Sequence, residues 1–391
     1  MKGAAEMKTL FVSSRSCSVL LDEEGLYLSR KPMELSLNGE AIGQEKRSVC
    51  SLFGLWPDTE YTLRIKDGES LTFRTEPESV SLDIRRFGAK GDGEHDDTGA
   101  LQAAILCCPP GGRVRIPAGT YRTAPLFLKS DLTLELQKGA TLALMTDRSR
   151  FPILPGVTMT TDEKDEYLLG TWEGNPLDMF AAALNGIGVS HVRIIGEGIV
   201  DGCAPDGDWW VEPKVKGGAY RGRLLYLRDC REVTIQGITF RNSPAWNLHP
   251  CFSEELCFLN VRVEAPASSP NTDGFDPESC RYVKMYGTVF SVGDDCIAIK
   301  SGRNEDGRRI GVPTANVIIR HNRFANGHGG ITLGSEISGG VHEVFAAGNH
   351  FDSPNLDYPI RFKTNAMRGG TLENVYVKDS VVNKARMAVV H

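Results

Sequence analysis

Short runs that alternate apolar and polar residues recur along most of this chain. From about residue 131 onward they include DLTLEL, HVRIIG, EVTIQG, CFLNVRV, YVKMYG, NVIIRH, EVFAAG and NVYVKD. The later runs start near residues 233, 257, 283, 317, 344 and 375, at intervals of roughly 24 to 34 residues. Strands this short cannot each support a separate sheet, but stacked in register they can bury their inward side chains in one continuous core. The pattern therefore predicts an all-β solenoid.

Polar motifs precede or overlap the apolar alternation in four successive units. They are Asn271-Thr272-Asp273-Gly274, Gly293-Asp294-Asp295, Gly327-His328-Gly329-Gly330 and Arg361-Phe362-Lys363. Because neighbouring rungs lie about 4.8 Å apart, we expect Asp273 and Asp294 on adjacent rungs, and His328 and Arg361 on the next two. Arg361 and Lys363 are two apart in a strand, so both point to the same face.

Carboxylates, a histidine and two cations on one open surface suit glycoside hydrolysis. That reaction needs a protonated carboxyl for the leaving oxygen and a carboxylate for water or for the sugar. Clustering Asp273, Asp294 and Asp295 raises at least one pKa by like-charge repulsion, so one carboxyl stays protonated near neutral pH. The alternatives are structural, because adjacent aspartates often cap turns, and His328 or Arg361 could satisfy backbone groups or pair with an interior acid.

Residues from about 8 to 76 have a different pattern, with strand-like runs at short spacing separated by turn residues. This is typical of a β-sandwich of immunoglobulin type. The segment LWPDTEYTL at residues 55–63 resembles the approach to strand F of fibronectin type III domains. In those domains the tyrosine hydroxyl bonds back to the chain, and we expect the same of Tyr61. We place the domains at residues 1–78 and 79–391, and expect the small one to shape one end of the other.

The second domain opens with Gly-Asp-Gly at residues 91–93, an Asp96-Asp97-Thr98 segment, a predicted helix over residues 99–108, and then PPGG and IPAGTY. Asp96 and Asp97 are expected to cap that helix. This order resembles the N-terminal cap and first rung of right-handed parallel β-helices of the pectate-lyase-like superfamily. The expected fold class is therefore all-β, a right-handed parallel β-helix preceded by a small fibronectin type III-like sandwich.

The four polar motifs resemble, in order and spacing, the signature segments of the polygalacturonase family of glycoside hydrolases, family 28. The resemblance covers residue 82 to the end, and Phe362 replaces the isoleucine common in the last motif. It implies inverting hydrolysis of α-1,4-galacturonosidic bonds, with Asp294 as general acid, Asp273 and Asp295 activating water, and His328 orienting or tuning the acid. Arg361 and Lys363 would hold a substrate carboxylate. Inverting enzymes typically place their carboxyl groups about 6.5–9.5 Å apart.

An anionic polymer that meets an acidic protein requires local positive potential. Lys300 and Arg303 are candidates to supply it, as are Arg308, Arg309 and Arg368, although the segment around Arg303 could be a solvated loop. Asn271 and Glu336 are further candidates for binding the substrate, a galacturonate-containing oligosaccharide or polysaccharide.

Two insertions, at residues 151–178 and 203–223, interrupt the repeat and carry Trp172, Trp209, Trp210 and Tyr220. Long loops on a regular scaffold usually carry specificity or block a groove, although the tryptophans could equally pack on the scaffold. The leading domain and the long loops resemble the exo-acting branch of the family. We therefore expect release of galacturonate from chain ends.

Composition excludes several other classes of function. The 391 residues carry a net charge of −6, which argues against nucleic acid as the main partner. The 10 cysteines include no Cys-x-x-Cys pair, so a zinc site is not expected, and we predict neither a metal nor a cofactor. No apolar run is long enough to cross a membrane and no signal peptide is visible, which favours a cytoplasmic protein, or a secreted one if the chain has lost its signal.

The last residues, MAVVH, lie inside an apparent strand. A solenoid needs a polar or covered last rung, so this ending suggests a truncation, with oligomerisation or reduced stability as consequences. A C-terminally extended chain is expected to melt at a higher temperature by circular dichroism.

Other activities fit the same scaffold. They are rhamnogalacturonan or xylogalacturonan hydrolysis within the family, calcium-dependent pectate lyase chemistry, and non-catalytic glycan binding of the kind found in adhesins and tailspikes.

Overall fold

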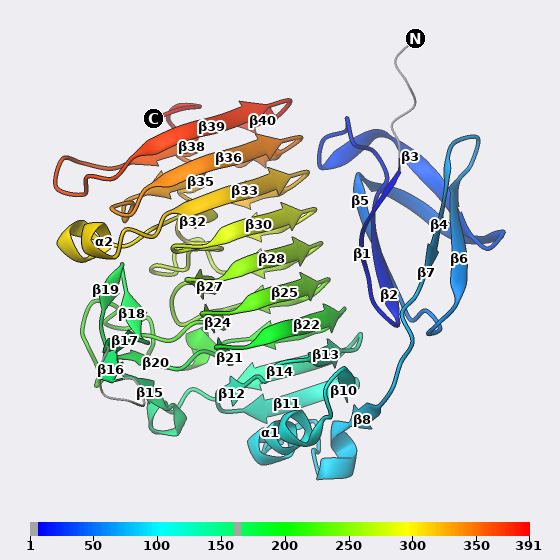
Figure 1. Ribbon diagram of the computed structural model, residues 1–391, viewed down its shortest axis with the longest axis horizontal. Coiled ribbons are helices and arrows are strands. Elements are labelled where there is room, and N and C mark those ends of the chain that lie inside the picture. Colours follow the sequence, from blue (N-terminus) through cyan, green and yellow to red (C-terminus); the bar gives the residue numbers. More distant parts are fainter. Residues whose placement is uncertain (1–6, 160–165) are drawn as a thin grey trace.

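Parallel sheets stacked rung on rung form most of the molecule in the computed structural model, which describes residues 7–159 and 166–391 (Figure 1). The first 10-stranded sheet consists of β8 (Ser81–Asp83), β10 (Gly112–Ile116), β13 (Leu132–Leu136), β22 (Ser190–Gly196), β25 (Arg231–Gln236), β28 (Glu254–Leu259), β30 (Arg281–Tyr286), β33 (Thr314–Arg320), β36 (Val341–Ala347) and β39 (Leu372–Lys378). The strands predicted near residues 233 to 375 all contribute to this sheet, at successive rungs.

A second 10-stranded sheet and a third, shorter-stranded one complete each rung. The second consists of β9 (Asp92–Asp96), β11 (Gly119–Thr123), β14 (Ala140–Leu144), β23 (Ile199–Asp201), β26 (Thr239–Arg241), β29 (Arg262–Glu264), β31 (Val289–Ser291), β34 (Arg323–Asn326), β37 (His350–Asp352) and β40 (Val381–Lys384). The third consists of β12 (Leu126–Phe127), β21 (Leu184–Ile187), β24 (Leu225–Arg228), β27 (Leu248–Cys251), β32 (Ile297–Ile299), β35 (Gly329–Gly334) and β38 (Tyr358–Lys363). Parallel bridges at Phe275 join β27 to β32, so the third sheet is continuous. The predicted parallel β-helix is confirmed.

The interior consists of side chains that occupy the same place in successive rungs. One such row pairs, strand to strand, Leu184, Leu225, Leu248, Phe275, Ile297, Ile331 and Ile360. All of them are buried. Another row stacks the rings of Phe290, Phe324 and Phe351, with centroids 5.5 Å and 4.5 Å apart. Each rung thus covers the apolar side chains of the one before it, which explains why short alternating runs suffice for a stable core.

Two small antiparallel sheets precede the β-helix. One consists of β1 (Lys8–Val12), β2 (Ser16–Leu20) and β5 (Val49–Phe53), and the other of β4 (Glu40–Arg47), β3 (Leu28–Leu37), β6 (Glu60–Ile65) and β7 (Ser70–Arg74). Residues of both sheets, among them Val19 and Leu63, share a core separate from that of the β-helix. The Trp56 N–H donates to the Tyr61 hydroxyl oxygen at 2.9 Å, which is the contact predicted for Tyr61.

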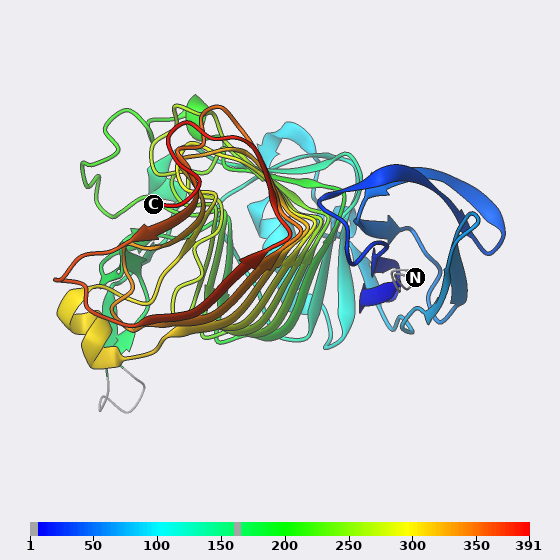
Figure 2. The ribbon, with the colours of Figure 1, turned by 90° about the horizontal axis from the view of Figure 1, so that it is seen from above.

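This sandwich lies along the flank of the β-helix, on the side away from α2 (Asn304–Ile310), rather than at one end as we expected (Figure 2). Buried side-chain amides of the β-helix, at the turns between its first two sheets, form hydrogen bonds with the sandwich. The Gln236 side chain bonds to the hydroxyls of Ser16 and Ser18 at 2.6 and 2.7 Å, and the Asn260 side-chain amide donates to the Val49 carbonyl at 3.0 Å. The small domain therefore contacts several rungs at once.

The helix predicted over residues 99–108 is α1 (Thr98–Cys107). Asp97 stands at its N-cap, but its carboxylate makes no capping bond to the helix. It accepts instead from the Lys90 and Gly91 N–H groups, at 2.7 and 3.0 Å. The expected capping role of Asp97 is therefore wrong, because the preceding loop competes for the same oxygens.

The remaining elements are short. They are the 3-10 helices η1 (Ile84–Phe87), η2 (Arg148–Arg150) and η3 (Ala204–Asp206), and the strands β15 (Ile153–Leu154), β16 (Val157–Met159), β17 (Glu166–Leu168), β18 (Thr171–Trp172), β19 (Asn175–Pro176) and β20 (Met179–Phe180). The first five of these strands belong to the insertion predicted at residues 151–178, of which residues 160–165 lie outside the described part, and β20 follows it directly. Among the described residues, no helix has the length and apolar character needed to cross a membrane.

The phenylalanine row gives a stability prediction. Replacing Phe324 by alanine removes a fully buried ring between two others, and we expect a loss of about 3–5 kcal/mol in the free energy of unfolding. Phe345 serves as the control because it also stacks on an aromatic ring, Tyr376, but is 43% exposed. Its alanine variant should lose about 1 kcal/mol or less. Urea unfolding followed by circular dichroism measures both, and equal losses would contradict the role assigned to the interior row.

Candidate active site

The polar motifs lie in the turns that lead into the third sheet. Asp273 precedes the bridge at Phe275, Asp294 and Asp295 precede β32, and His328 precedes β35. Backbone bonds join these turns, because the Gly274 N–H donates to the Asp295 carbonyl and the His328 N–H to the Asp294 carbonyl, both at 2.9 Å. The motifs therefore stack on adjacent rungs, in the predicted order.

The carboxylates of Asp273, Asp294 and Asp295 form a tight cluster. One oxygen from each lies within 4.8 Å of the other two. The Asp295 side chain is 0% exposed and Asp273 is buried, whereas Asp294 faces the surface. These distances join selected oxygens, and they are not the separation of the carboxyl groups that distinguishes inverting from retaining enzymes. The inversion implied by the resemblance therefore stays a prediction at this point.

Two cations from β38 face the same cluster. The Lys363 Nζ lies 3.4 Å from Asp295 Oδ2, and Arg361 Nη1 lies 3.8 Å from Asp295 Oδ1. Their side chains remain 38% and 23% exposed, so both cations also face solvent. Arg361 and Lys363 thus compensate the buried Asp295 charge and keep donors open to an anionic ligand.

Three acid–base groups of the site, Asp273, Asp294 and His328, have shifted pKa values. Burial and the Asp294 charge raise the pKa of Asp273 well above its usual range. Burial acts the same way on Asp294, but His328, whose Nδ1 lies 3.4 Å from Asp294 Oδ1, and the Lys363 charge outweigh it and hold that pKa below its usual value. The same contact with Asp294 raises the pKa of His328. Asp273 therefore holds a proton more tightly than Asp294 does.

Lys300 and Glu336, which we expected to bind substrate, are buried against each other. The Lys300 Nζ lies 2.8 Å from Glu336 Oε2, and the two side chains are 5% and 6% exposed. Gly174 of the insertion lies against the Glu336 side chain, and with so little exposed surface neither residue is open to a ligand in this structure. A substrate-binding role for Lys300 and Glu336 is thus corrected.

Arg303 and Asn271, the other predicted binding residues, form contacts within the protein. Arg303 Nη1 lies 3.0 Å from Glu173 Oε2, at the tip of the insertion. The Arg221 guanidinium donates to Asn271 Oδ1 at 2.7 Å. Asn271 has a positive φ of 55°, which places it in a tight turn directly before the Asp273 rung.

The insertion at residues 151–178 covers the floor formed by the third sheet upstream of the carboxylates. Its β18–β19 hairpin approaches the floor through the Thr171 carbonyl, which accepts from Arg223 at 3.4 Å. Trp172 stacks on Tyr220 and on Trp246, with ring centroids 4.9 and 6.2 Å apart. The hairpin tip is fastened on the far side by the ion pair between Glu173 and Arg303.

The two tryptophans of the second insertion pack on the scaffold. Trp209 is fully buried and packs edge-on against Phe151 and Phe180. The Trp210 indole N–H donates to the Ser243 carbonyl at 3.2 Å. Trp209 and Trp210 therefore have the structural role that we left open.

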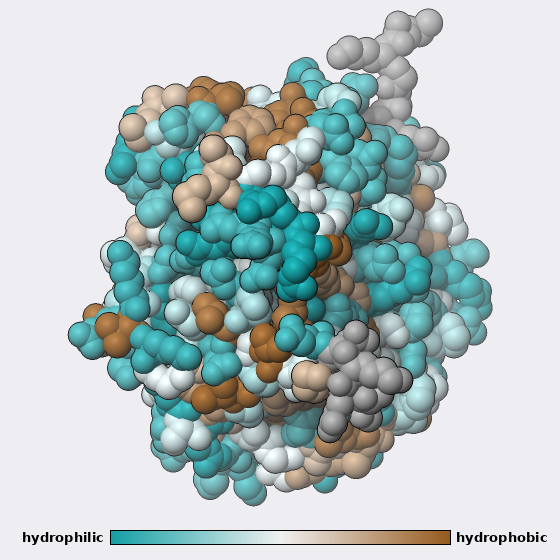
Figure 3. Space-filling model, turned by 60° about the vertical axis from the view of Figure 1, so that its left-hand side comes forward, coloured by the Kyte–Doolittle hydropathy of each residue, from teal (hydrophilic) through white to brown (hydrophobic). Residues whose placement is uncertain are grey.

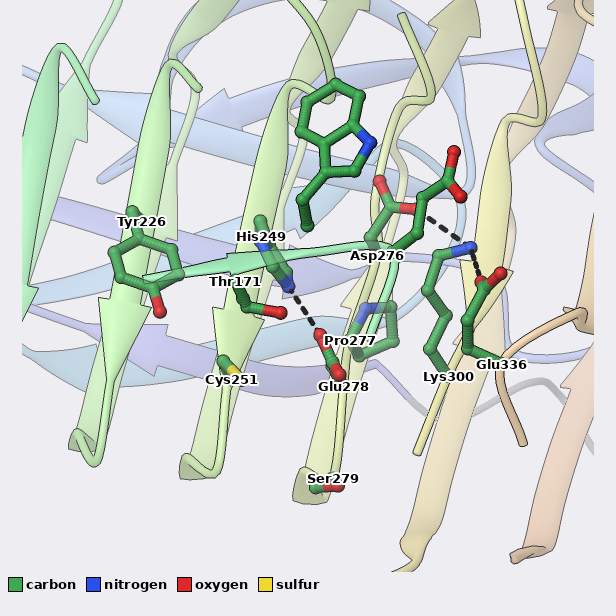
Figure 4. A network of polar contacts seen from close by, with 12 residues as sticks. Thr171, Tyr226, His249, Cys251, Asp276, Pro277, Glu278, Ser279, Lys300 and Glu336 are labelled. Atoms are coloured by element: carbon green, nitrogen blue, oxygen red, sulfur yellow. Dashed lines mark hydrogen bonds and ion pairs between the residues drawn. The ribbon is translucent and has the colours of Figure 1, made fainter. Parts of the chain in front are cut away.

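The structure adds floor residues that the sequence analysis did not single out, and Figure 4 shows several of them. Asp276 is fully buried beside Lys300, with Asp276 Oδ1 at 3.7 Å from Lys300 Nζ. One rung away, His249 Nε2 lies 3.0 Å from Glu278 Oε2, and burial lowers the pKa of His249 to about 4. The alternation in FDPESC was the available signal, because Asp276 and Glu278 point away from the buried Phe275.

Two groups among the described residues bring ligand-type atoms within 4.8 Å, Asp273–Asp294–Asp295 and His249–Cys251–Glu278. In the first, the cations of Arg361 and Lys363 already face Asp295. In the second, Arg228 Nη1 lies 3.4 Å from Cys251 Sγ, and its charge opposes a metal ion at that position. We therefore assign no metal to either group.

The side of the molecule with α2 and the insertion carries mostly hydrophilic residues, with hydrophobic ones scattered among them (Figure 3). A surface of this kind suits a polar, hydrogen-bonding ligand better than an apolar one.

Comparisons with known proteins agree with this geometry. Residues 130–390 match the family model described as glycosyl hydrolases family 28. A probable polygalacturonase of Vitis vinifera is 31% identical over 318 residues, which are 79% of this chain and 62% of that protein. The chain thus spans less than two thirds of the length of this relative.

Two solved structures have the same fold. The family 28 exopolygalacturonase of Yersinia enterocolitica has a TM-score of 0.75 at 22% identity, and the alignment covers 99% of this chain and 80% of that one. A hyperthermoactive exopolygalacturonase of Thermotoga maritima has a TM-score of 0.69 at 30% identity, covering 80% and 76%. Because the family model matches about two thirds of this chain, the chain belongs to glycosyl hydrolases family 28.

Proposed function

We propose that this chain is a pectin-degrading hydrolase that cleaves α-1,4-galacturonosidic bonds with inversion and releases galacturonate from chain ends. The observation that carries the proposal is the cluster of Asp273, Asp294 and Asp295 facing Arg361 and Lys363, in a chain of family 28. The names of the relatives from Vitis vinifera and Thermotoga maritima, a probable polygalacturonase and an exopolygalacturonase, support this choice of substrate.

Recognition of galacturonate is assigned to Arg361 and Lys363. Both side chains contact Asp295 and remain partly exposed, so each can pair with a second carboxylate on the solvent side. The guanidinium of Arg361 can hold a uronate carboxylate through two parallel bonds, whereas Lys363 supplies a point charge. A neutral sugar would leave these cations without that partner, which favours a uronate.

In the proposed mechanism Asp294 protonates the leaving oxygen, and Asp273 with Asp295 activates water. Asp294 suits the acid role because it is the most exposed carboxylate of the cluster, but His328 and Lys363 hold it ionised in the free protein. A substrate carboxylate on Lys363 removes part of that positive field, and a sugar over Asp294 removes water. Both effects raise the pKa of Asp294, so substrate binding moves the proton from Asp273 toward it.

Inversion is supported by burial rather than by carboxylate spacing. Asp295 is fully buried and Asp273 nearly so, which leaves neither with a free face for a covalent bond to a sugar carbon. A water molecule can contact the 5% of Asp273 that remains exposed, and attack by water in a single displacement inverts the anomeric carbon.

Exo action is supported by the covered floor. The β18–β19 hairpin lies on Trp246 and Tyr220 and is fastened by Glu173 and Arg303, so a polymer cannot continue along the floor past this point. A chain end can still reach the carboxylates from the open side.

The finer assignments of domain and location belong to the same proposal. We assign the N-terminal sandwich to the fibronectin type III type, on the sheet composition and the Tyr61 contact. Its packing along several rungs suits a supporting role. The cytoplasmic location expected from the sequence stays a prediction, for which imported oligogalacturonides would be the substrate, and cell fractionation tests it.

Asp294→Asn tests the acid. We expect turnover on polygalacturonate to fall about 10²- to 10⁴-fold because the amide cannot donate an acidic proton. Binding of the substrate should persist, as measured by calorimetry. Asp306→Asn, on exposed helix α2, is the control and should keep full turnover. Unchanged turnover in Asp294→Asn would instead indicate a non-catalytic glycan-binding protein.

The products of polygalacturonate digestion test the mode of action. We expect monomeric galacturonate from the first minutes, with a slow fall in viscosity, since the hairpin admits only chain ends. Ion-exchange chromatography of the products measures this. Mid-length oligomers at early times would argue for internal cleavage, and products that absorb in the ultraviolet and vanish with chelator would indicate a lyase. Activity confined to rhamnogalacturonan or xylogalacturonan would move the substrate assignment within the family.

The anomer released first tests inversion. Hydrolysis of the α-linkage by single displacement should give β-galacturonate before mutarotation mixes the two forms. Proton NMR of the anomeric signals during the first minutes of a fast reaction distinguishes them. Initial release of the α-anomer would show a double displacement and overturn the role of water proposed here.

A further inference from the structure

A fully buried arginine lies where the β18–β19 hairpin meets the floor of the third sheet. Arg223 comes just before β24, and its Cζ lies 4.9 Å from the centroid of the Trp172 ring and 4.8 Å from that of the Trp246 ring. Trp172 belongs to the hairpin, whereas Trp246 precedes β27 and is part of the floor. The two rings are nearly parallel, with an angle of 10° between their planes. One guanidinium group therefore contacts both the side chain that covers the floor and the side chain that is covered.

Arg223 has no carboxylate partner among the ion pairs of the described residues, although its side chain is completely buried. Its hydrogen bonds go to backbone carbonyls, among them that of Arg221 at 2.5 Å and that of Thr171, on the hairpin, at 3.4 Å. A buried cation without a carboxylate needs other electron-rich partners, and the face of a tryptophan ring is the best aromatic one. The rings of Trp172 and Trp246 are therefore the main partners of this charge.

The tip of the hairpin has a second, more exposed attachment. Its two-residue turn consists of Glu173 and Gly174, with φ of 49° and 73°. Glu173 pairs with Arg303, but these side chains are 42% and 30% exposed, and exposed ion pairs contribute little to stability. The contact at Arg223 is shielded from water, so we expect it to hold the hairpin more strongly than the pair at the tip.

Arg221 contacts the same hairpin ring but is tied to the proposed catalytic rungs. Its Cζ lies 5.4 Å from the centroid of the Trp172 ring. Its guanidinium donates to Asn271 Oδ1 at 2.7 Å and to the Pro270 carbonyl at 2.9 Å, in the turn before Asp273. Loss of Arg221 would disturb that turn directly, whereas none of the hydrogen bonds and ring contacts of Arg223 involves it.

We propose that Arg223 is a positioning residue that determines specificity. By contacting Trp172 and Trp246 at once, it keeps the hairpin seated on the floor and so restricts the site to chain ends. The inference rests on the proposed function for the galacturonan substrate and for exo action, and it names the side chain on which that mode of action depends.

Loss of the guanidinium should loosen the hairpin without removing a catalytic group. A cation–π contact of this kind, together with the bond to Thr171, corresponds to about a tenfold change in the equilibrium between a seated and a displaced hairpin. The outward row of the floor runs from Tyr226 and His249 to Asp276, three residues after Asp273. A displaced hairpin would therefore let a polymer continue along the floor and be cleaved internally.

The products of polygalacturonate digestion by Arg223→Met test the inference. We expect the share of mid-length oligomers in the first minutes to rise about tenfold above that of the unaltered chain, in proportion to the displaced hairpin. Arg223→Lys keeps the charge but loses the planar group, and should give an intermediate share. Arg113→Met is the matched control, because Arg113 is also buried but pairs with Glu135 at 2.7 Å in the first rungs. It should lower the melting temperature and leave the products unchanged.

Hydrogen exchange gives a second readout that requires no substrate. Amides of residues 166–177 should exchange about tenfold faster in Arg223→Met than in the unaltered chain, whereas Arg113→Met should leave their exchange unchanged. Trp172→Ala removes the partner of Arg223 on the hairpin side, and should release oligomers as Arg223→Met does. If Arg223→Met does not fold, the products of Trp172→Ala decide.

Other outcomes separate the possible failures. Monomer as the only early product of Arg223→Met overturns the inference, whether or not exchange becomes faster. Oligomers from Arg303→Gln, with none from Arg223→Met, also overturn it, because the pair at the tip would then hold the hairpin. If the unaltered chain hydrolyses no pectic substrate, or cleaves it internally, the proposed function fails. The exchange rates then still test whether Arg223 keeps the hairpin on the floor.

Discussion

Hydrogen bonds between parallel strands hold each rung about 4.8 Å from the next, and the candidate site depends on this spacing. The bonds from Gly274 to Asp295 and from His328 to Asp294 show the same ladder continuing through the turns. Side chains that are tens of residues apart in the chain are thereby placed within one hydrogen-bond length or two of one another. The cluster is therefore assembled from turns that belong to the rungs themselves.

The same spacing imposes a cost, since it brings like charges together in a poorly hydrated wall. Asp295 is tolerable there because Arg361 and Lys363 approach its two oxygens. The buried carboxylates of Asp276 and Glu336 are compensated by Lys300, which forms an ion pair with each of them. Removing one member of such a set leaves an uncompensated buried charge, which typically costs about 3–5 kcal/mol. The cluster is thus a balance of charges, in which each proton affinity reflects several partners.

The alternation of residues and the place of each motif in its repeat were enough to predict a solenoid and the stacking of Asp273, Asp294, His328 and Arg361, and the resemblance to a known family added the parallel β-helix. They could not predict what covers a residue that points away from the core. Lys300 was expected to bind substrate, but it pairs with Glu336, which lies 36 residues further along the chain. The capping expected of Asp97 failed for a similar reason, because residues of the preceding loop bind its oxygens.

The third sheet and the insertion that covers part of it therefore determine different properties of the candidate site. The outward rows of the third sheet continue without a break from Tyr226 and His249 past the carboxylates to Arg361. By itself such a floor could accept a polymer along its whole length. What ends it is the hairpin at Trp172 and Glu173, which comes from an insertion that the repeat does not require. Under the proposed function, the rungs supply the catalytic groups and the insertion decides between chain end and chain interior, so the two can change independently.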